Sequence, residues 1–134
     1  MSDLEIVTQN EKLDIFFIHQ FISNSYWGKN RTINEMKICI NNSLNFGVFM
    51  NEKQIGYARV VTDYSQFAYL MDVFIDLNYR GNGYGKLLIN FILNFDCLSN
   101  VKLWRLATSN THGLYEKFGF QKIKYPEKFM ELIR

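Results

Sequence analysis

The stretch YRGNGYGK, residues 79–86, places three glycines within five positions and lies between two apolar runs. Glycine lacks a Cβ, so it lets the backbone turn sharply and lets another molecule approach the chain closely. The run before it, 67–75, predicts a strand, and the run after it repeats apolar residues at helical spacing from Leu87 to Phe95. Free N–H groups in the first turn of a helix, together with the helix dipole, bind anions. The stretch therefore predicts a strand, a turn and a helix that can hold a phosphate.

Length and composition predict one domain over residues 1–134. The chain is 48% hydrophobic with a single proline, which is typical of a sequence that buries its own core and not of a disordered one. Its 15 basic and 13 acidic residues are scattered, so charge gives no indication of nucleic-acid binding.

Other classes of protein are disfavoured by what the chain lacks. It has no apolar run near the roughly 18 residues that cross a bilayer, and the polar start, residues 1–12, is unlike a secretory signal. We therefore expect no membrane partner and a cytoplasmic location. Cys39 and Cys97 have no neighbours at metal-ligand spacing, so we expect two buried, reduced thiols and no metal.

The remaining patterns predict an α+β fold in which helices flank a mixed central sheet. Thr32 and Glu35 have the spacing of a capping box at the start of a second helix, and Gly119 is placed to end a short helix near the C-terminus. The first two strands form a hairpin. The predicted helices cover residues 13–23, 32–42, the segment from the glycines to about 96–99, and 113–118; the predicted strands cover 46–50, 55–62, 67–75, 101–108, 120–123 and 129–133.

Of three phosphate-binding patterns rich in glycine, one fits the glycine turn. Walker A requires Ser or Thr directly after Lys86, where the chain has Leu87, so it fails. The dinucleotide pattern GxGxxG, begun at Gly81, requires glycine at position 86 itself, where the chain has lysine, so it fails too. The pattern [Q/R]-x-x-G-x-[G/A] fits Arg80, Gly83 and Gly85. Here the chain resembles the GNAT superfamily of N-acetyltransferases, and GLYEKFGF, residues 113–120, is similar to that superfamily's second signature. The resemblance covers about residues 47–123.

The resemblance implies the GNAT acyl-CoA N-acyltransferase fold, with acetyl-CoA in a gap between the strands 67–75 and 101–108. In relatives these strands splay apart at one end. Lys86 either adds a charge to the phosphate site or is an ordinary solvated residue. The implied cofactor contacts are backbone amides of Val73, Phe74 and Ile75 along the pantetheine arm, and Arg80, Gly81, Asn82, Gly83, Tyr84 and Gly85 around the pyrophosphate.

Two residues are candidates for proton transfer. Tyr115 matches the superfamily tyrosine that protonates the departing thiolate, and the alternative is a ring that only packs under the short helix. Asp72 is the nearest carboxylate to the implied site of the base. Strand alternation turns it away from the face of Tyr69 and Met71 unless a bulge intervenes, so it either acts in catalysis or accepts structural hydrogen bonds. A water relay would need no dedicated base.

The segment before Tyr115 departs from the superfamily pattern. Many relatives have asparagine seven positions before this tyrosine, where the chain has Thr108. Asn110 is then a candidate cofactor contact, or it caps the short helix. His112 either reaches the cleft or lies on the surface.

The acceptor side is indicated only by the fold. Tyr26, Trp27, Lys29 and Arg31 lie between the first two helices, where relatives bind the acceptor, and they either contact it or anchor the connection. We predict direct acetyl transfer to the amine of a small molecule or peptide in a ternary complex, because neither cysteine is near a motif. The alternatives are a non-catalytic CoA-binding regulatory module and, disfavoured by charge, a toxin that acetylates aminoacyl-tRNA. The sequence leaves open whether the chain forms a homodimer.

Overall fold

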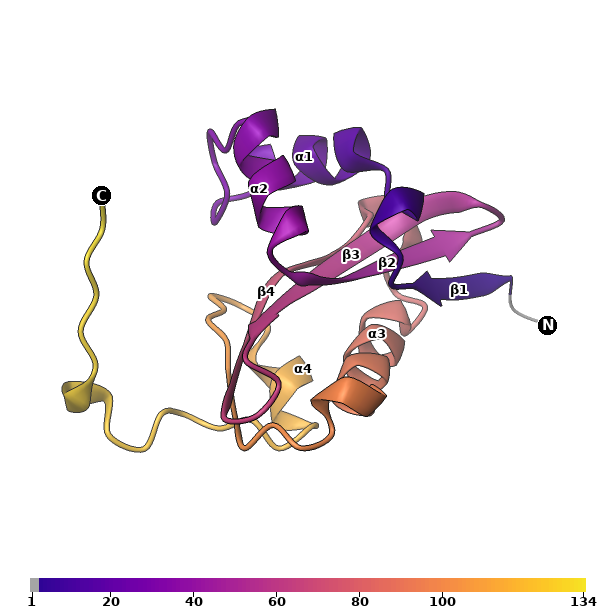
Figure 1. Ribbon diagram of the computed structural model, residues 1–134. Coiled ribbons are helices and arrows are strands. Elements are labelled where there is room, and N and C mark those ends of the chain that lie inside the picture. The colour runs from indigo at the N-terminus through magenta and orange to yellow at the C-terminus, as the bar shows by residue number, and fades with distance from the viewer. Residues whose placement is uncertain (1–2) are drawn as a thin grey trace.

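The computed structural model describes residues 3–134; Met1 and Ser2, the start of the polar N-terminal stretch and of the expected domain, lie outside the described residues. Helices α1 and α2 lie on one side of a sheet, and α3 and α4 lie on the other (Figure 1). The predicted α+β class with a mixed sheet is confirmed. The helices are α1 (Ile15–Ser23), α2 (Ile33–Asn41), α3 (Tyr84–Leu93) and α4 (His112–Glu116), with 3-10 turns at Asn10–Lys12, Leu77–Tyr79, Asp96–Leu98 and Pro126–Lys128.

Five strands form this sheet in the order β1-β2-β3-β4-β5. The strands β1 to β4 pair antiparallel with one another, and β5 runs parallel to β4. The hairpin predicted from the strands 46–50 and 55–62 is present as the antiparallel pair of β2 and β3. The strand β4 has the predicted bounds. The strands are β1 (Leu4–Val7), β2 (Leu44–Met50), β3 (Lys53–Thr62), β4 (Phe67–Ile75) and β5 (Leu103–Arg105).

Side-chain caps set the starts of the first two helices. The carboxylate of Asp14 accepts a hydrogen bond from the amide of Phe17 at 3.1 Å, so α1 begins two residues later than its apolar pattern. Thr32 accepts from the amide of Glu35, and the Glu35 carboxylate accepts from the amide of Thr32, which confirms the capping box.

The sheet separates two groups of buried side chains. On the α3 side, Leu88, Ile89 and Ile92 pack against apolar residues of β2, β3 and β4. On the other side, residues of α1 and α2 pack against Tyr57 and Phe74. The helical periodicity of the sequence is therefore matched by burial on both faces.

Several sequence predictions are wrong in their extent. The strand expected over 101–108 has only three residues, because the chain leaves β4 after Arg105, and β1 was not predicted. The closing strands expected at 120–123 and 129–133 do not form among the described residues, and every residue from 121 to 134 is exposed. A strand needs a neighbouring strand to pair with, and this segment pairs with no strand of the sheet within residues 3–134. Cys97 is exposed and Cys39 half-buried, so the expectation of two buried thiols also fails.

Candidate functional site

A bulge interrupts β4 where it lies beneath the connection between α1 and α2. The pairing of β3 with β4 shifts between Tyr57 and Arg59, so Asp72 and Val73 together face Ala58. Asp72 has a φ of 55°, in the left-handed region that side-chain-bearing residues seldom adopt. The bulge turns this carboxylate toward α1 and α2, whereas alternation alone would turn it away.

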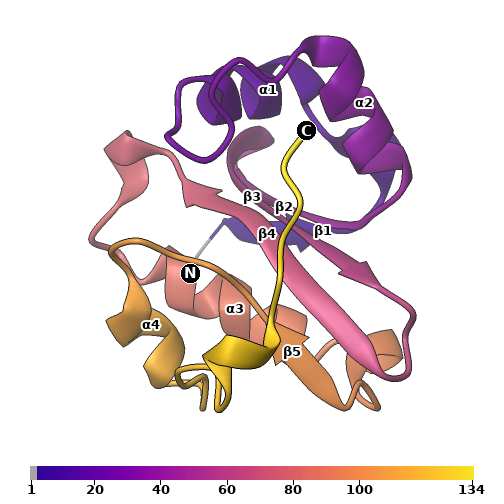
Figure 2. The same cartoon turned by 90° about the vertical axis from the view of Figure 1, so that its left-hand side faces the viewer.

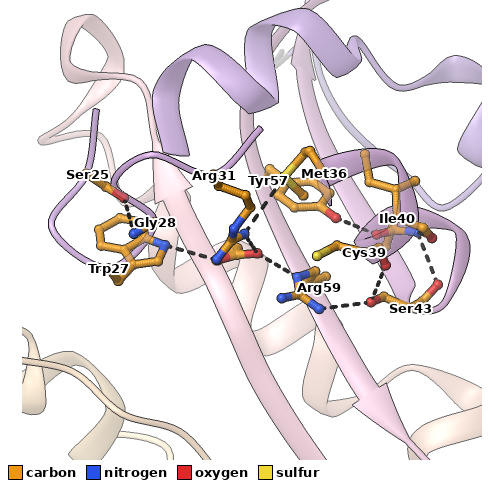
Figure 3. Close-up of polar contacts among 12 residues, drawn as sticks. Ser25, Trp27, Gly28, Arg31, Met36, Cys39, Ile40, Ser43, Tyr57 and Arg59 are labelled. Carbon is orange, nitrogen blue, oxygen red and sulfur yellow. Dashed lines mark hydrogen bonds and ion pairs between the residues drawn. The ribbon is translucent and has the colours of Figure 1, made fainter. Parts of the chain in front are cut away.

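Three donors bind the buried carboxylate of Asp72. The Nε of Arg59 and an Nη of Arg31 approach Oδ2 at 2.5 and 2.7 Å, and the indole N–H of Trp27 donates to Oδ1 at 3.0 Å. Figure 3 shows these three side chains converging from β3 and from the α1–α2 connection. A general base needs a free lone pair near the acceptor, and these contacts favour the structural alternative. A catalytic role for Asp72 stays a prediction.

The sheet opens next to this cluster. The ladder between β4 and β5 contains only three pairs, from Phe67 with Leu103 to Tyr69 with Arg105. Beyond that point β5 ends, and Figure 2 shows the chain leaving β4 on its way to α4. The backbone of β4 from Leu70 onward, which includes the predicted contacts at 73–75, has no strand partner on this side within residues 3–134. An extended ligand can pair with such an edge.

The glycine turn follows β4 directly and forms the start of α3. Gly81 and Gly83 have φ values of 84° and 80°, and nothing lies within 4 Å of where a Cβ would be. Their backbone conformation, and not crowding, is therefore what requires glycine. Gly83 occupies the cap position of α3 without a side-chain cap, so the first amides of the helix face an open hollow. This arrangement suits an anion.

The two basic residues of the glycine turn, Arg80 and Lys86, have different surroundings. The Nε of Arg80 donates to the carbonyl oxygen of Ile75 at 3.1 Å, which ties the turn to the end of β4. Lys86 is exposed beside the hollow at the start of α3. Both interpretations of Lys86, added charge or solvated residue, agree with this position.

Tyr115 has a buried ring and a free hydroxyl. Its ring packs edge-to-face against Phe120, with centroids 5.9 Å apart, inside the group of side chains on the α3 side. No hydrogen bond of the described residues uses its Oη, yet no buried side-chain oxygen among them lacks a partner, so the hydroxyl reaches solvent. Burial, and then the neighbouring Tyr26, raise the pKa of Tyr115 to about 12. At neutral pH this hydroxyl is a hydrogen-bond donor.

The α1–α2 connection reaches across to the segment before α4. The Oη of Tyr26 accepts a hydrogen bond from the amide of Ser109 at 3.2 Å, and its ring packs edge-on against Trp27. Tyr26 and Trp27 therefore anchor this connection, and Arg31 does the same through Asp72. Lys29 is exposed. A contact of these residues with an acceptor stays a prediction.

Sequence reasoning missed two members of the site. Arg59 is the one charged residue in the predicted strand 55–62, and such a charge is buried only with a partner, so the strand pattern carried a signal. Ser109 contributes its backbone amide, for which no side-chain pattern exists.

The start of α4 differs from its prediction. The cap position is Thr111 and has no side-chain cap, so the interpretation of Asn110 as the cap is wrong. The hydroxyl of Thr111 is instead hydrogen-bonded to that of Thr108 at 2.6 Å. Asn110 and His112 are both exposed. A cofactor contact of Asn110 stays a prediction.

No group of three or more His, Cys, Asp or Glu side chains within residues 3–134 is placed to hold a metal ion. No helix in this range has the length and apolar character needed to cross a membrane.

Solved structures share this architecture. A protein of Xanthomonas campestris assigned to the GNAT acetyltransferase family is 37% identical, with a TM-score of 0.96 over 100% of this chain and 95% of its own. Residues 121–134 are about a tenth of the chain, so this score requires that the C-terminal segment overlays as well. A Clostridium acetobutylicum protein crystallised with acetyl-CoA is 18% identical, with a TM-score of 0.72 over 99% of this chain and 96% of its own. That match shows the fold alone.

Sequence comparisons agree. An uncharacterised N-acetyltransferase of Pyropia yezoensis is 27% identical over 87% of this chain and 70% of its own length. The model of the acetyltransferase (GNAT) domain matches residues 42–122, more than half of the chain, and includes the bulge, the glycine turn and Tyr115. The chain belongs to the GNAT family of acetyltransferases.

Proposed function

We propose that this GNAT protein transfers an acetyl group from acetyl-CoA directly to the amine of a small molecule or peptide, in a ternary complex. The family implies acyl transfer from acetyl-CoA. The observation that carries the proposal is the opened edge of β4, which ends at a glycine turn with free helix amides. An extended arm fits the first feature and a pyrophosphate the second, so the fit to acetyl-CoA rests on this chain's own backbone.

Acetyl-CoA supplies a thioester whose carbonyl carbon the amine attacks. A carbon–nitrogen bond forms, the carbon–sulfur bond breaks, and the amine loses its proton to water. A backbone amide of residues 73–75, which begin at the bulge, polarises the carbonyl. A fixed donor of this kind contributes about 3 kcal/mol in other acyl transfers.

Tyr115 then gives its proton to the departing thiolate. Its pKa of about 12 keeps the hydroxyl protonated over the whole neutral range, so the donor is always present. Full transfer to a thiolate with a reference pKa near 8.5 is uphill by about 5 kcal/mol in the free protein, so the hydroxyl first stabilises the departing thiolate as a hydrogen-bond donor. We assign Asp72 to positioning, because it fixes the α1–α2 connection over β4.

The test is thiol release from acetyl-CoA with a panel of amines. Tyr115→Phe should lower kcat by about 100-fold, the lower range for a general acid, and should leave the Kd for acetyl-CoA within a few-fold of the wild-type value by calorimetry. Tyr64→Phe, at an exposed loop tyrosine, is the matched control and should change neither quantity. Absence of binding heat with acetyl-CoA, or full turnover by Tyr115→Phe, would contradict the proposal.

The same measurements distinguish the alternative of a CoA-binding regulatory module. The full engagement of Asp72 supports this alternative, because it leaves the most apparent carboxylate without a catalytic role. A module of this kind would bind acetyl-CoA with measurable heat and release no thiol above the hydrolytic background with any amine of the panel.

A further inference from the structure

The cluster around Asp72 contains more positive than negative charge. The guanidinium groups of Arg31 and Arg59 donate to the same oxygen, Oδ2 of Asp72, at 2.7 and 2.5 Å (Figure 3). Within residues 3–134, Asp72 supplies the only carboxylate that pairs with either guanidinium. The side chains of Arg31 and Arg59 are only 17% and 8% exposed, so water screens their mutual repulsion poorly. A second anion beside them would therefore be bound favourably.

Arg31 has hydrogen-bond donors left for such an anion. Its Nη1 donates to Asp72 and, at 3.8 Å, to the sulfur of Met36. Its Nε and Nη2 take part in no hydrogen bond of the described residues. No buried side-chain nitrogen among these residues lacks a partner, so both atoms reach solvent. The N–H groups of Nε and Nη2 are parallel in a guanidinium, and such a pair binds both oxygens of one carboxylate.

The backbone of Arg31 is fixed on both sides of its Cα. Its amide donates to the carbonyl oxygen of Gly28 at 3.0 Å, and Nε2 of His19 donates to its own carbonyl oxygen at 2.7 Å. The next residue, Thr32, begins the capping box of α2. Together with the ion pair to Asp72, these contacts hold the guanidinium in one position. A donor fixed in this way loses little conformational entropy when it binds a ligand.

Arg31 also lies beside the proposed place of acetyl transfer. The carboxylate that it contacts belongs to Asp72, which directly precedes the amides at 73–75 proposed to polarise the thioester carbonyl. The indole N–H of Trp27 donates to the same carboxylate, and the ring of Trp27 packs edge-on against that of Tyr26. These rings are 39% and 63% exposed. A ligand held by Arg31 therefore has an aromatic surface and the opened edge of β4 next to it.

We propose that the acceptor is a small molecule with a carboxylate close to its amine, such as a free amino acid, and that the Nε–Nη2 edge of Arg31 binds this carboxylate. The inference rests on the proposed function and names the class of its acceptor. The bound carboxylate balances the positive charge that Asp72 alone leaves uncompensated. The amine of the same molecule is then held near the thioester, at the opened edge of β4.

The chain's own acidic residues do not occupy this edge of Arg31. Glu35 is the nearest acid along the sequence, but its carboxylate accepts a hydrogen bond from the amide of Thr32 at 2.8 Å. Hydrogen bonds from Thr32 lower the pKa of Glu35 first, and the charge of Arg31 is the last cause. Glu35 is fully exposed, so water screens this attraction. The edge of Arg31 is thus available to a ligand.

The first experiment compares acceptors that differ only in the carboxylate. Thiol release from acetyl-CoA is measured with each common L-amino acid and with its carboxamide, which keeps the amine and the side chain but has no negative charge. For the best acceptor, kcat/KM should be at least about 10-fold higher for the acid, because a hydrogen-bonded ion pair is lost in the amide. Equal values, or higher values for carboxamides, would overturn this inference and leave the proposed function intact. No thiol release from any member of the panel would overturn both.

The second experiment assigns the preference to Arg31. Arg31→Gln should lower kcat/KM for the best acid by about 10- to 100-fold and change that of its carboxamide by no more than a few-fold. Arg31→Lys should recover part of the loss, because it keeps the charge but not the parallel N–H pair. Lys37→Gln, at an exposed cation on α2, is the matched control and should leave both values unchanged. A variant whose α1–α2 connection has merely moved would lose both activities in parallel, and that result would contradict the assignment.

The third experiment measures binding apart from turnover. Calorimetry is performed with the best acid and its carboxamide in the presence of saturating CoA, which has no acetyl group to transfer. The Kd of the acid should be at least about 10-fold lower than that of the carboxamide, and Arg31→Gln should abolish this difference. Equal Kd values in the wild-type protein would overturn the inference.

Discussion

The two faces of the sheet are built from different kinds of buried residue. On the α3 side the buried side chains are apolar except for the hydroxyl of Tyr115. On the side of α1 and α2, the chain also buries polar groups, each bonded to a side chain or backbone atom. Among the described residues the buried polar or charged side chains are Asn45, Gln54, Arg59 and Asp72.

This difference gives the two faces different roles: the apolar face contributes stability, and the polar face fixes the position of a loop. Apolar contact is non-directional, so the α3 face is stable without specifying where any loop must lie. A buried ion cluster costs desolvation energy but has one favourable geometry. The cluster of Asp72, Arg31 and Trp27 places the α1–α2 connection over the bulge of β4, next to the opened edge of the sheet. The polar face therefore defines one wall of the candidate site.

The largest expected effect comes from removing the carboxylate of Asp72, which Arg31, Arg59 and Trp27 all contact. Asp72→Ala leaves the guanidinium of Arg59 buried without compensation, so the free energy of unfolding in urea should fall by about 3–5 kcal/mol. In a Trp104→Phe background, the emission of Trp27 should also shift to longer wavelength as the connection loosens. Asp96→Ala, at an exposed aspartate, is the control. A loss below about 1 kcal/mol would show that the cluster contributes little.

A cavity on the opposite face should lower stability without moving the connection. Leu88→Ala empties a fully buried position on α3, and we expect a loss of about 3 kcal/mol in the free energy of unfolding. The Trp27 emission of the folded variant should stay unchanged in the same background. Leu87→Ala, at an exposed neighbour, is the control. A shifted emission in Leu88→Ala would mean that the two faces are coupled.

Alkaline pH should weaken both faces through their buried tyrosines. Burial raises the pKa of Tyr57, and it raises that of Tyr115 to about 12. The unfolded chain ionises near pH 10 and the folded chain later, so the contribution of each tyrosine is present below pH 10 and is lost above it. For Tyr115 the loss between pH 10 and 12 is about 2 kcal/mol.

Urea unfolding from pH 9 to 12 measures this loss. The free energy of unfolding of Tyr57→Phe and of Tyr115→Phe should decline less steeply with pH than that of the wild type. Tyr64→Phe, at an exposed tyrosine, should follow the wild-type curve. If the free energy of unfolding declined equally with pH in the wild type and all three variants, the loss could not be assigned to Tyr57 and Tyr115.

The smallest effect concerns a surface cap on the polar face. Thr32→Ala removes the side-chain half of the capping box of α2 and should cost about 1 kcal/mol in the free energy of unfolding. Thr32→Ser keeps the hydroxyl and should recover most of this loss. Equal stability of the alanine and serine variants would show that the cap is not needed once α2 is packed.

Much of the fold was predictable because local patterns encode it. The alternation of β4, the periodicity of α3 and the capping box each depend on residues a few positions apart. The prediction failed where a partner decides the outcome. Four residues at β1 form a strand because β2 pairs with them, whereas residues 129–133 have strand composition but pair with no strand in the described part of the chain.

For the site, the sequence by itself determined the glycine turn and the place of Tyr115, because a positive φ and a motif spacing are local properties. The tertiary structure alone decided the bulge and the environment of Asp72. Its partners lie 13, 41 and 45 positions away, so they meet only once β3 pairs with β4 and the α1–α2 connection packs over them. Such contacts depend on strand register and packing, which no short stretch of sequence specifies.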